Sequence, residues 1–306
     1  MKNKKATIRK KEKRYFIQAS SFFIVYCEKT GFMTHIVKEK RNLMYKKISL
    51  FLLYIVFCGA LCAVGIKGLL CSFEETILPE GIVTTNAYRK QEIGEEICQS
   101  LQEKENIGEF VAEYLLKREW DYKSWEKNET FEEYNQFTKA IWNDVKYFPI
   151  PEFQKSAKMT VSYVNTWLAE RTYGGRRGHE GTDLIASINE RGLYPVVSMT
   201  DGKITKKGWL EKGGYRIGVT APNGAYFYYA HLESYAHFEE GDVIKAGDVL
   251  GFMGDSGYGE EGTVGQFVVH LHLGIYIYPE GKEVSVNPYW VLRYIENKRV
   301  KCYTEV

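Results

Sequence analysis

The chain has 306 residues and a net charge of +2, and this length allows one large domain or two smaller domains with appended segments. Its six cysteines show no CxxC spacing, which excludes the common cysteine-based metal motifs. The small net charge conceals an asymmetry: residues 1–47 carry 14 Lys/Arg against 3 Glu, whereas residues 72–152 carry 9 basic against 18 acidic side chains.

A run of 19 residues without a charge, 48–66, follows the basic tail 1–47. This length suffices to cross a bilayer core, so we predict a transmembrane helix over 48–71. The Lys/Arg excess before it predicts a single-pass protein of the cell membrane with a cytoplasmic N-terminus and an extracytoplasmic remainder. We read the basic tail as a topology signal and expect no nucleic-acid partner. A cleaved signal peptide is the alternative to this anchor. Separately, Met44 would make a natural start of the chain.

Residues 72–152 are predicted to form an extracytoplasmic helical segment. Apolar side chains recur at helical spacing from Ile107 to Leu115 and again from Phe131 to Val145. Pro149 and Pro151 disfavour helix and mark a linker. The pattern is typical of a packing module; binding of glycan by its Trp and Tyr residues is the alternative.

From residue 153 to 306 the sequence changes to short β-type runs broken by glycines, with a hairpin turn signal at 221–224. Many short strands with regular turns predict an antiparallel β domain. The fold class predicted for the whole chain is therefore α+β: an N-terminal transmembrane helix, a helical juxtamembrane segment and a C-terminal antiparallel β-sheet domain.

The chemistry-bearing residues gather in this β-rich region. His270 and His272 alternate with aliphatic residues, so both point to one face of a strand. His179 and Asp183 stand four residues apart, and His231 ends an aromatic strand. Three N/O ligands and a water describe a catalytic zinc site, with two histidines left to move protons. Each motif alone is weak, but together, in this order and among strands, they indicate such a site.

Residues 160–290 resemble the M23, lysostaphin- or LytM-type, zinc metallopeptidases of peptidoglycan. The matching motifs are His179–Asp183, Asp201-Gly202, Tyr229–Leu232, Gly241–Gly247 and His270–His272. Carried over residue by residue, the resemblance implies one Zn²⁺ ion per chain bound by His179, Asp183 and His272. It implies that His231 and His270 are catalytic, orienting the water and stabilising the tetrahedral intermediate. Tyr173 matches a tyrosine that some members place near the oxyanion.

The resemblance implies a zinc metalloendopeptidase that hydrolyses peptide cross-links of peptidoglycan through a metal-activated water, with the peptide stems as its binding partners. A second class stays open, a non-catalytic scaffold or activator of a division or sporulation complex on the same fold. The loop 257–269 is longer and more acidic than the Gly-x-Ser-Thr-Gly-Pro run of many members, so the cleaved bond stays open. The 241–250 segment resembles a biotinyl or lipoyl hairpin but lacks a lysine in the required turn.

Overall fold

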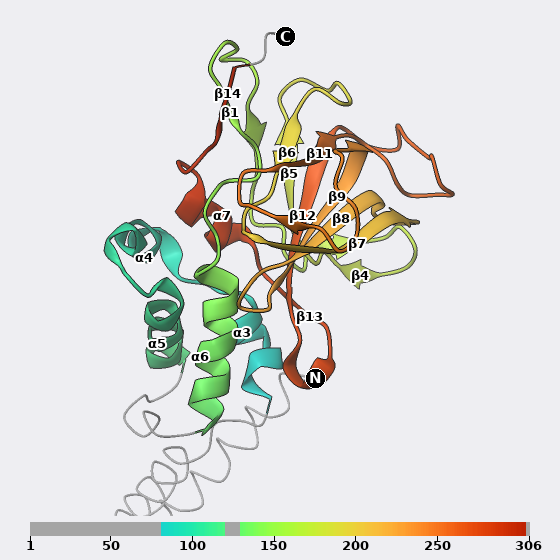
Figure 1. Ribbon diagram of the computed structural model, residues 1–306. Coiled ribbons are helices and arrows are strands. Elements are labelled where there is room, and N and C mark those ends of the chain that lie inside the picture. The colour runs from blue at the N-terminus through green and yellow to red at the C-terminus, as the bar shows by residue number, and fades with distance from the viewer. Residues whose placement is uncertain (1–80, 120–128, 304–306) are drawn as a thin grey trace, which may run out of the picture. The chain divides into compact units, whose positions relative to one another are not determined.

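The computed structural model of the protein describes residues 81–119 and 129–303 (Figure 1). The basic tail and the transmembrane helix predicted over 48–71 lie outside these residues. Within the described ranges, none of the helices is long and apolar enough to cross a membrane.

The described chain begins with helices, as the apolar spacing predicts, and the two longest are α5 and α6. The buried residues Val111 and Leu115 of α5 are at most 1 % exposed, which confirms the predicted apolar stripe. The α-helices are α3 (Asn86–Arg89), α4 (Gly94–Ser100), α5 (Ile107–Glu119), α6 (Glu129–Trp142) and α7 (Tyr289–Ile295). Short 3-10 helices cover Ile82–Thr84, Leu101–Glu103 and Pro279–Gly281.

Most strands of the remaining chain form one ten-stranded sheet whose pairs are all antiparallel. The predicted antiparallel β domain is therefore confirmed. The main path runs β10-β7-β8-β9-β12-β5-β2, with β11 paired to β6 and β9, and β13 paired to β12. These strands are β2 (Val161–Ser162), β5 (Thr182–Ala186), β6 (Pro195–Val197), β7 (Gly202–Leu210), β8 (Gly214–Thr220), β9 (Tyr226–Tyr235), β10 (Val243–Ile244), β11 (Val249–Met253), β12 (His270–Ile277) and β13 (Val284–Val286).

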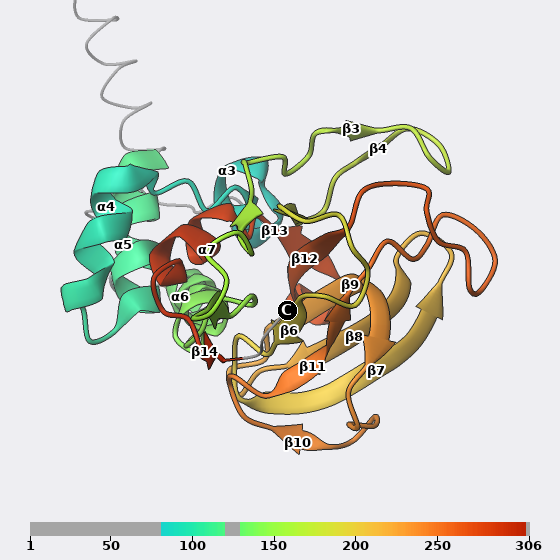
Figure 2. The same ribbon diagram turned by 90° about the horizontal axis from the view of Figure 1, so that it is seen from above.

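Alternate side chains of the central strand β12 point into the core and toward the opposite face of the sheet. Leu271, Leu273 and Ile275 are fully buried on one face, and each such side chain contributes about 1.5–3 kcal/mol relative to exposure. The same apolar cluster includes residues of α6 and α7, which lie on one side of the sheet (Figure 2). A one-residue slip of register would expose this face. The alternate residues, His270 and His272, are thereby held on the opposite face.

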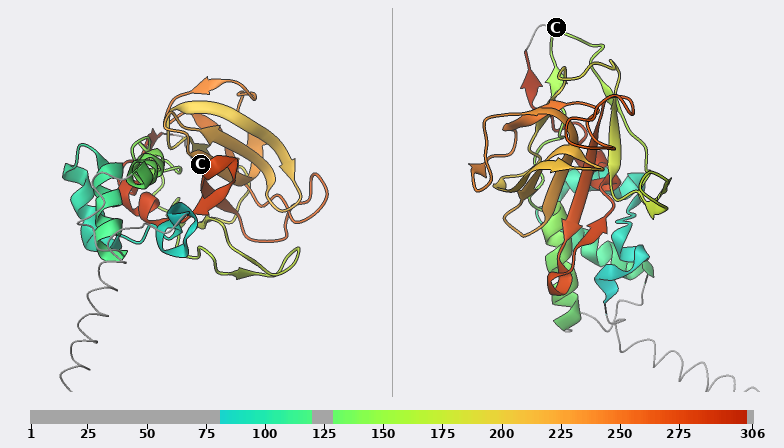
Figure 3. Two further views of the ribbon diagram at one scale, coloured as in Figure 1. Left: turned by 90° about the horizontal axis from the view of Figure 1, so that it is seen from below. Right: turned by 90° about the vertical axis from the view of Figure 1, so that its right-hand side faces the viewer.

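Two loops border that opposite face at one end. The first carries the short hairpin β3 (Glu170–Arg171) and β4 (Arg177–Gly178), and the second joins β11 to β12. The two loops lie side by side (Figures 2 and 3). Tyr173 of the first stacks on Tyr258 of the second, with ring centroids 4.0 Å apart and planes inclined by 3°. At the far end of the chain, β1 (Glu152–Phe153) pairs in parallel with β14 (Lys301–Cys302).

Candidate metal centre and cleft

Strand register brings the predicted site residues together from distant parts of the chain. On β12, His272 pairs with Asp183 of β5 on one side and with Ala230 of β9 on the other. His179 lies four residues before Asp183, and His231 directly follows Ala230. All five predicted histidine and aspartate residues therefore converge on one face of three neighbouring strands.

Three of these side chains direct a ligand atom to a common point. Nε2 of His179 lies 2.9 Å from Nδ1 of His272, and both nitrogens lie 2.9–3.0 Å from Oδ1 of Asp183. Ligand atoms around a tetrahedral zinc ion stand about 3.3 Å apart, given Zn–N bonds of about 2.0–2.1 Å. Two imidazole nitrogens and a carboxylate oxygen are also the donor types that zinc prefers. The residues therefore fit a divalent metal of the zinc type.

The atoms behind the three ligands fix their orientation. Nδ1 of His179 lies 3.2 Å from the Thr166 carbonyl oxygen and 3.0 Å from its hydroxyl, so this nitrogen carries the proton when it donates to the carbonyl. Nε2 is then left unprotonated toward the metal position. Arg171 donates from Nη2 to Oδ2 of Asp183 over 2.7 Å, leaving Oδ1 for the centre. Such partners orient metal ligands and tune their affinity.

A glycine makes room for this packing. A Cβ at Gly181, between His179 and Asp183, would lie 2.5 Å from Cε1 of His272 and 2.5 Å from the Leu273 carbonyl oxygen. Both distances are shorter than real Cβ contacts, so the imidazole reaches its position only beside glycine.

Burial and the close contacts of the ligand side chains set the protonation of the centre. Burial by itself raises the pKa of the Asp183 carboxyl, but the ring nitrogens of His179 and His272 beside it outweigh burial and hold the pKa well below its usual range. Burial lowers the pKa of His272, more than Asp183 raises it. A carboxylate and a neutral imidazole at neutral pH are the forms that bind a metal.

The other two histidines stand beside the metal position with one nitrogen each already engaged. Nδ1 of His231 donates to the Ser256 carbonyl oxygen over 2.7 Å, and Nδ1 of His270 donates to that of Val268 over 2.8 Å. Their Nε2 atoms are therefore unprotonated in the neutral ring. Burial lowers the pKa of both imidazoles, which favours this neutral form. The ring centroids are 4.7 Å apart, so the two imidazoles are direct neighbours.

The backbone of His231 is strained. Its φ of +62° lies in the left-handed region, where the chain bulges between β9 and its neighbours β8 and β11. Such a conformation costs a non-glycine residue about 1–3 kcal/mol and occurs preferentially at functional sites. The bulge turns the imidazole toward His270 instead of into the core.

These residues line an open cleft of about 650 Å³, a volume in the range of ligand sites. Tyr226, Tyr228 and Tyr276 form part of its lining, and burial raises the pKa of each phenol, so all three are neutral donors. Tyr173 does not line the cleft; it stacks on Tyr258, which does.

Sequence reasoning missed several residues of the site. Thr166 and Arg171 support the metal ligands, and Ser256 holds His231, but none of them stands in a recognisable motif. The cations Arg177 and Arg216 line the cleft as well. Their positions follow from strand register and loop conformation, which no local pattern shows.

An antiparallel β domain whose cleft holds a His/Asp/His cluster and two further histidines has the architecture of a metallopeptidase. The profile of Peptidase family M23 matches residues 177–288, which include all five of these side chains. A solved structure from Ruminococcus gnavus, provisionally named glycyl-glycine endopeptidase lytM, is 52 % identical and superposes with a TM-score of 0.68. The match covers 73 % of this chain and 96 % of that one. The chain belongs to peptidase family M23.

Two further relatives have names that describe different peptide bonds. L-Ala–D-Glu endopeptidase of Bacillus subtilis is 43 % identical over 147 residues, covering 48 % of this chain and 42 % of the relative. Glycyl-glycine endopeptidase ALE-1 of Staphylococcus capitis is 32 % identical over 107 residues, covering 32 % of this chain and 28 % of the relative. The chain thus spans less than half the length of either relative.

Proposed function

We propose that the protein is a zinc-dependent endopeptidase that hydrolyses peptide bonds in bacterial peptidoglycan. The observation that carries this proposal is the convergence of His179, Asp183 and His272 on one point, with the unprotonated Nε2 atoms of His231 and His270 beside it. The names of the relatives supply the reaction class, since each describes an endopeptidase.

His179, Asp183 and His272 would hold the zinc ion. When bound, the metal supplies Lewis-acid chemistry: it polarises a peptide carbonyl and lowers the pKa of a water toward neutrality. The carboxylate form of Asp183 offsets part of the metal charge. Arg171 and Thr166 hold the ligand side chains in place, so that little reorganisation is needed when the metal binds.

His270 and His231 would carry the proton transfers. Hydrolysis adds a water oxygen to the carbonyl carbon, breaks the C–N bond and moves one proton to the departing amine. A neutral Nε2 accepts a proton from the attacking water and afterwards donates it to the amine nitrogen. While protonated, the imidazolium stabilises the negative oxygen of the tetrahedral intermediate. His270 is placed for this role because its Nε2 lies 3.8 Å from Oδ1 of Asp183.

We further propose that the protein acts outside the cell, held at the membrane by a helix over 48–71. The 19 uncharged residues and the preceding excess of Lys/Arg support this topology. In this arrangement the helical segment 72–152 stands between the membrane and the β-rich region 153–306. Labelling of single cysteines on either side of residues 48–71 in intact cells tests it, and labelling of residues before 48 from outside would contradict it.

The test of the activity uses the purified full-length chain with bound zinc quantified by elemental mass spectrometry. Purified peptidoglycan is digested, and the released peptides are identified by mass spectrometry. We expect the wild type to contain about one zinc ion and to release peptides with new amino termini, and His272→Ala to do neither. If the two proteins release the same peptides, or the wild type releases none, the peptidase assignment fails.

A further inference from the structure

The cleft is rich in cations that the metal centre does not use. Its lining includes the basic residues Arg171, Arg177, Lys206, Lys212 and Arg216, against the acidic residues Glu180, Asp183 and Glu283. Within the described residues, Arg171 is the only one of these cations that forms an ion pair, and its partner is Asp183. Of the acids, Asp183 belongs to the metal centre and Glu283 accepts a hydrogen bond from Tyr278. Glu180 pairs with Arg89. The lining therefore has five cations against three carboxylates, and four of these cations form no ion pair with a carboxylate of the described residues.

Two cations of the cleft have unmet bonding capacity. Nη1 of Arg216 and Nε of Arg177 are buried and have no hydrogen-bond partner among the described residues. Of the two, Arg216 lies on the main sheet, whereas Arg177 lies in the β3–β4 hairpin. A buried guanidinium nitrogen without an acceptor costs free energy, since it loses water without a replacement. In a cleft open to solvent, a bound ligand can supply the acceptor. A carboxylate is the complementary ligand, because its two oxygens match the planar guanidinium.

Strand pairing places the backbone of Arg216 two strands away from His272 of the metal centre. On the main path of the sheet, β9 separates β8 from β12, and Arg216 lies in the bulge of β8 opposite Ala230 and His231. With strands about 4.8 Å apart, its Cα lies about 10 Å from that of His272. The Tyr235 hydroxyl contacts both the amide nitrogen and the carbonyl oxygen of Arg216, at 3.1 and 3.2 Å. Arg216 thus stands on a hydrogen-bonded part of the sheet, and its Cα is separated from that of His272 by roughly the span of three extended peptide residues.

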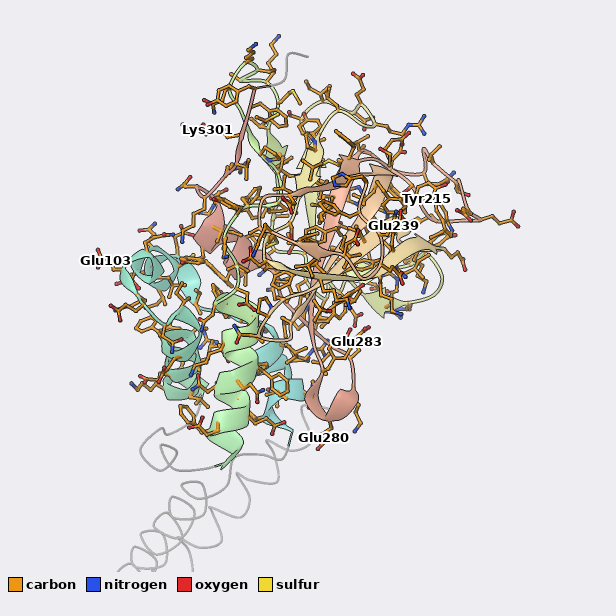
Figure 4. The ribbon with its side chains drawn as sticks, viewed as in Figure 1. Glu103, Tyr215, Glu239, Glu280, Glu283 and Lys301 are labelled. Atoms are coloured by element: carbon orange, nitrogen blue, oxygen red, sulfur yellow. The ribbon has the colours of Figure 1, made fainter. Side chains whose placement is uncertain are left out.

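Lys206 adds a second charge on the same face. It lies on β7, where it pairs with Gly218, two residues beyond Arg216 on β8. The floor between these strands and β12 is aromatic: the Tyr226 ring lies directly over Gly218, and the Tyr228 hydroxyl over Gly213. Glu283, labelled in Figure 4, lines this cleft and also the neighbouring pocket that contains Thr84 and Arg89. The cleft thus has an excess of cations, and Arg216 and Lys206 are two of them.

We propose that Arg216, flanked by Lys206, binds the free carboxylate of an acidic residue next to the scissile bond. The enzyme then prefers acidic stem peptides, of the L-Ala–D-Glu kind, over uncharged glycyl-glycine bridges. This inference rests on the proposed peptidase function and names its substrate class. A glycine bridge has no side chain or free carboxylate to pair with Arg216, so it leaves the buried nitrogen without an acceptor.

The test compares two stem peptides that differ by one charge, an L-Ala–D-Glu peptide with a free α-carboxylate and the same peptide with a carboxamide there. Pentaglycine is the third substrate. Cleavage gives kcat/KM, and calorimetric titration of the zinc-loaded full-length chain that carries His270→Ala, and so turns over too slowly to consume the peptide, gives Kd. We expect a preference for the acid over the amide of about tenfold in both measurements, the scale of a charge-assisted bond, and the least cleavage for pentaglycine.

Three variants decide which cation is responsible. In Arg216→Gln we expect the acid-to-amide ratio to fall to about one, and an unchanged zinc content and circular-dichroism spectrum show that the variant is folded. Lys203→Gln is the matched control, because it removes a positive charge from the same sheet but outside the cleft. In this variant the acid-to-amide ratio should stay at the wild-type value. Exposed Lys206→Gln should lower the ratio about threefold, and it decides the question if Arg216→Gln does not fold.

The outcomes separate the inference from the proposed function. Equal cleavage and equal binding of acid and amide would overturn the carboxylate site while leaving the peptidase intact. Preferential cleavage of pentaglycine, or loss of the ratio in Arg177→Gln instead of Arg216→Gln, would also overturn it. If the wild type cleaves no peptide but binds the acid more tightly, and Arg216→Gln abolishes this difference, the carboxylate site stands and the peptidase assignment fails.

Discussion

Arg171 binds one carboxylate oxygen of Asp183 and leaves the other oxygen for the candidate metal centre. Nη2 of Arg171 lies 2.7 Å from Oδ2, while Oδ1 of the same side chain faces the ring nitrogens of His179 and His272. Arg171 comes from a short hairpin strand, whereas Asp183 lies on a strand of the main sheet. The hairpin therefore supports the metal ligand without contributing one itself.

Removal of this support should weaken the metal site. We expect Arg171→Ala to lower zinc affinity about 10- to 100-fold, the usual cost of losing a group that orients a metal ligand. Competition with a chelator of known affinity measures the change. Arg176→Ala is the matched control, because this neighbouring arginine is exposed and pairs with Glu170. Equal zinc affinity of Arg171→Ala and the control would contradict the role of Arg171.

The two histidines of β12 should separate metal binding from turnover. His272→Ala removes one of the three candidate ligand side chains, so we expect the protein to lose zinc and activity together. His270→Ala leaves the cluster complete, so we expect zinc content to stay at the wild-type level while kcat falls by a factor of about 10² or more. Elemental analysis and single-turnover digestion of peptidoglycan measure the two quantities. Equal zinc loss from both variants would refute this division of roles.

Asp201 should make stability depend on pH. A hydrogen bond from Lys146, together with one from the Ala246 amide, holds the pKa of this carboxyl below its ordinary value. A lowered pKa in the folded state means that the stabilisation is complete above the unfolded pKa of about 3.9 and is lost as pH falls through the folded pKa. Because the side chain is partly exposed, we expect about 0.5–1 kcal/mol at pH 7.

The measurement is the difference in unfolding free energy between wild type and Asp201→Asn, from urea titrations at several pH values. We expect this difference to be constant near neutrality and to shrink below about pH 4. Contributions from all other carboxylates cancel in the difference. A difference that grows as the pH falls would have the wrong sign and exclude the assigned linkage.

A buried hydrogen bond should stabilise the helical segment. Trp142 donates from its indole nitrogen to the Gln91 side-chain oxygen over 2.7 Å, and both residues are fully buried. Gln91→Leu leaves that N–H without an acceptor, which costs about 1–3 kcal/mol of unfolding free energy. Trp142→Phe in the Gln91→Leu background should recover part of the loss, because the unpaired donor is gone. Additive effects of the two substitutions would show that the hydrogen bond is not the cause.

Local sequence patterns were sufficient to predict the helices and strands whose apolar residues recur at a regular spacing. The period of two in His270–Leu273 predicted a strand with both histidines on one face, and the stripe in 107–115 predicted helix α5; both are confirmed. Local spacing succeeds here because helix and strand geometry decide which neighbouring side chains share a face. The division of the site residues into metal ligands and catalytic histidines stays a prediction that the experiments above test.

The sequence alone determined the chemistry available to this protein, because residue type and local period specify the imidazoles, the carboxylate and the face of the strand they occupy. Only the tertiary structure decided which groups meet. His272 and Asp183 are 89 residues apart in sequence, and a register between β12 and β5 pairs them. Arg171 and Arg216 belong to no motif, and loop conformation and strand order bring them to the cleft. Their roles depend on long-range pairing, which follows from packing of the whole core and not from local spacing.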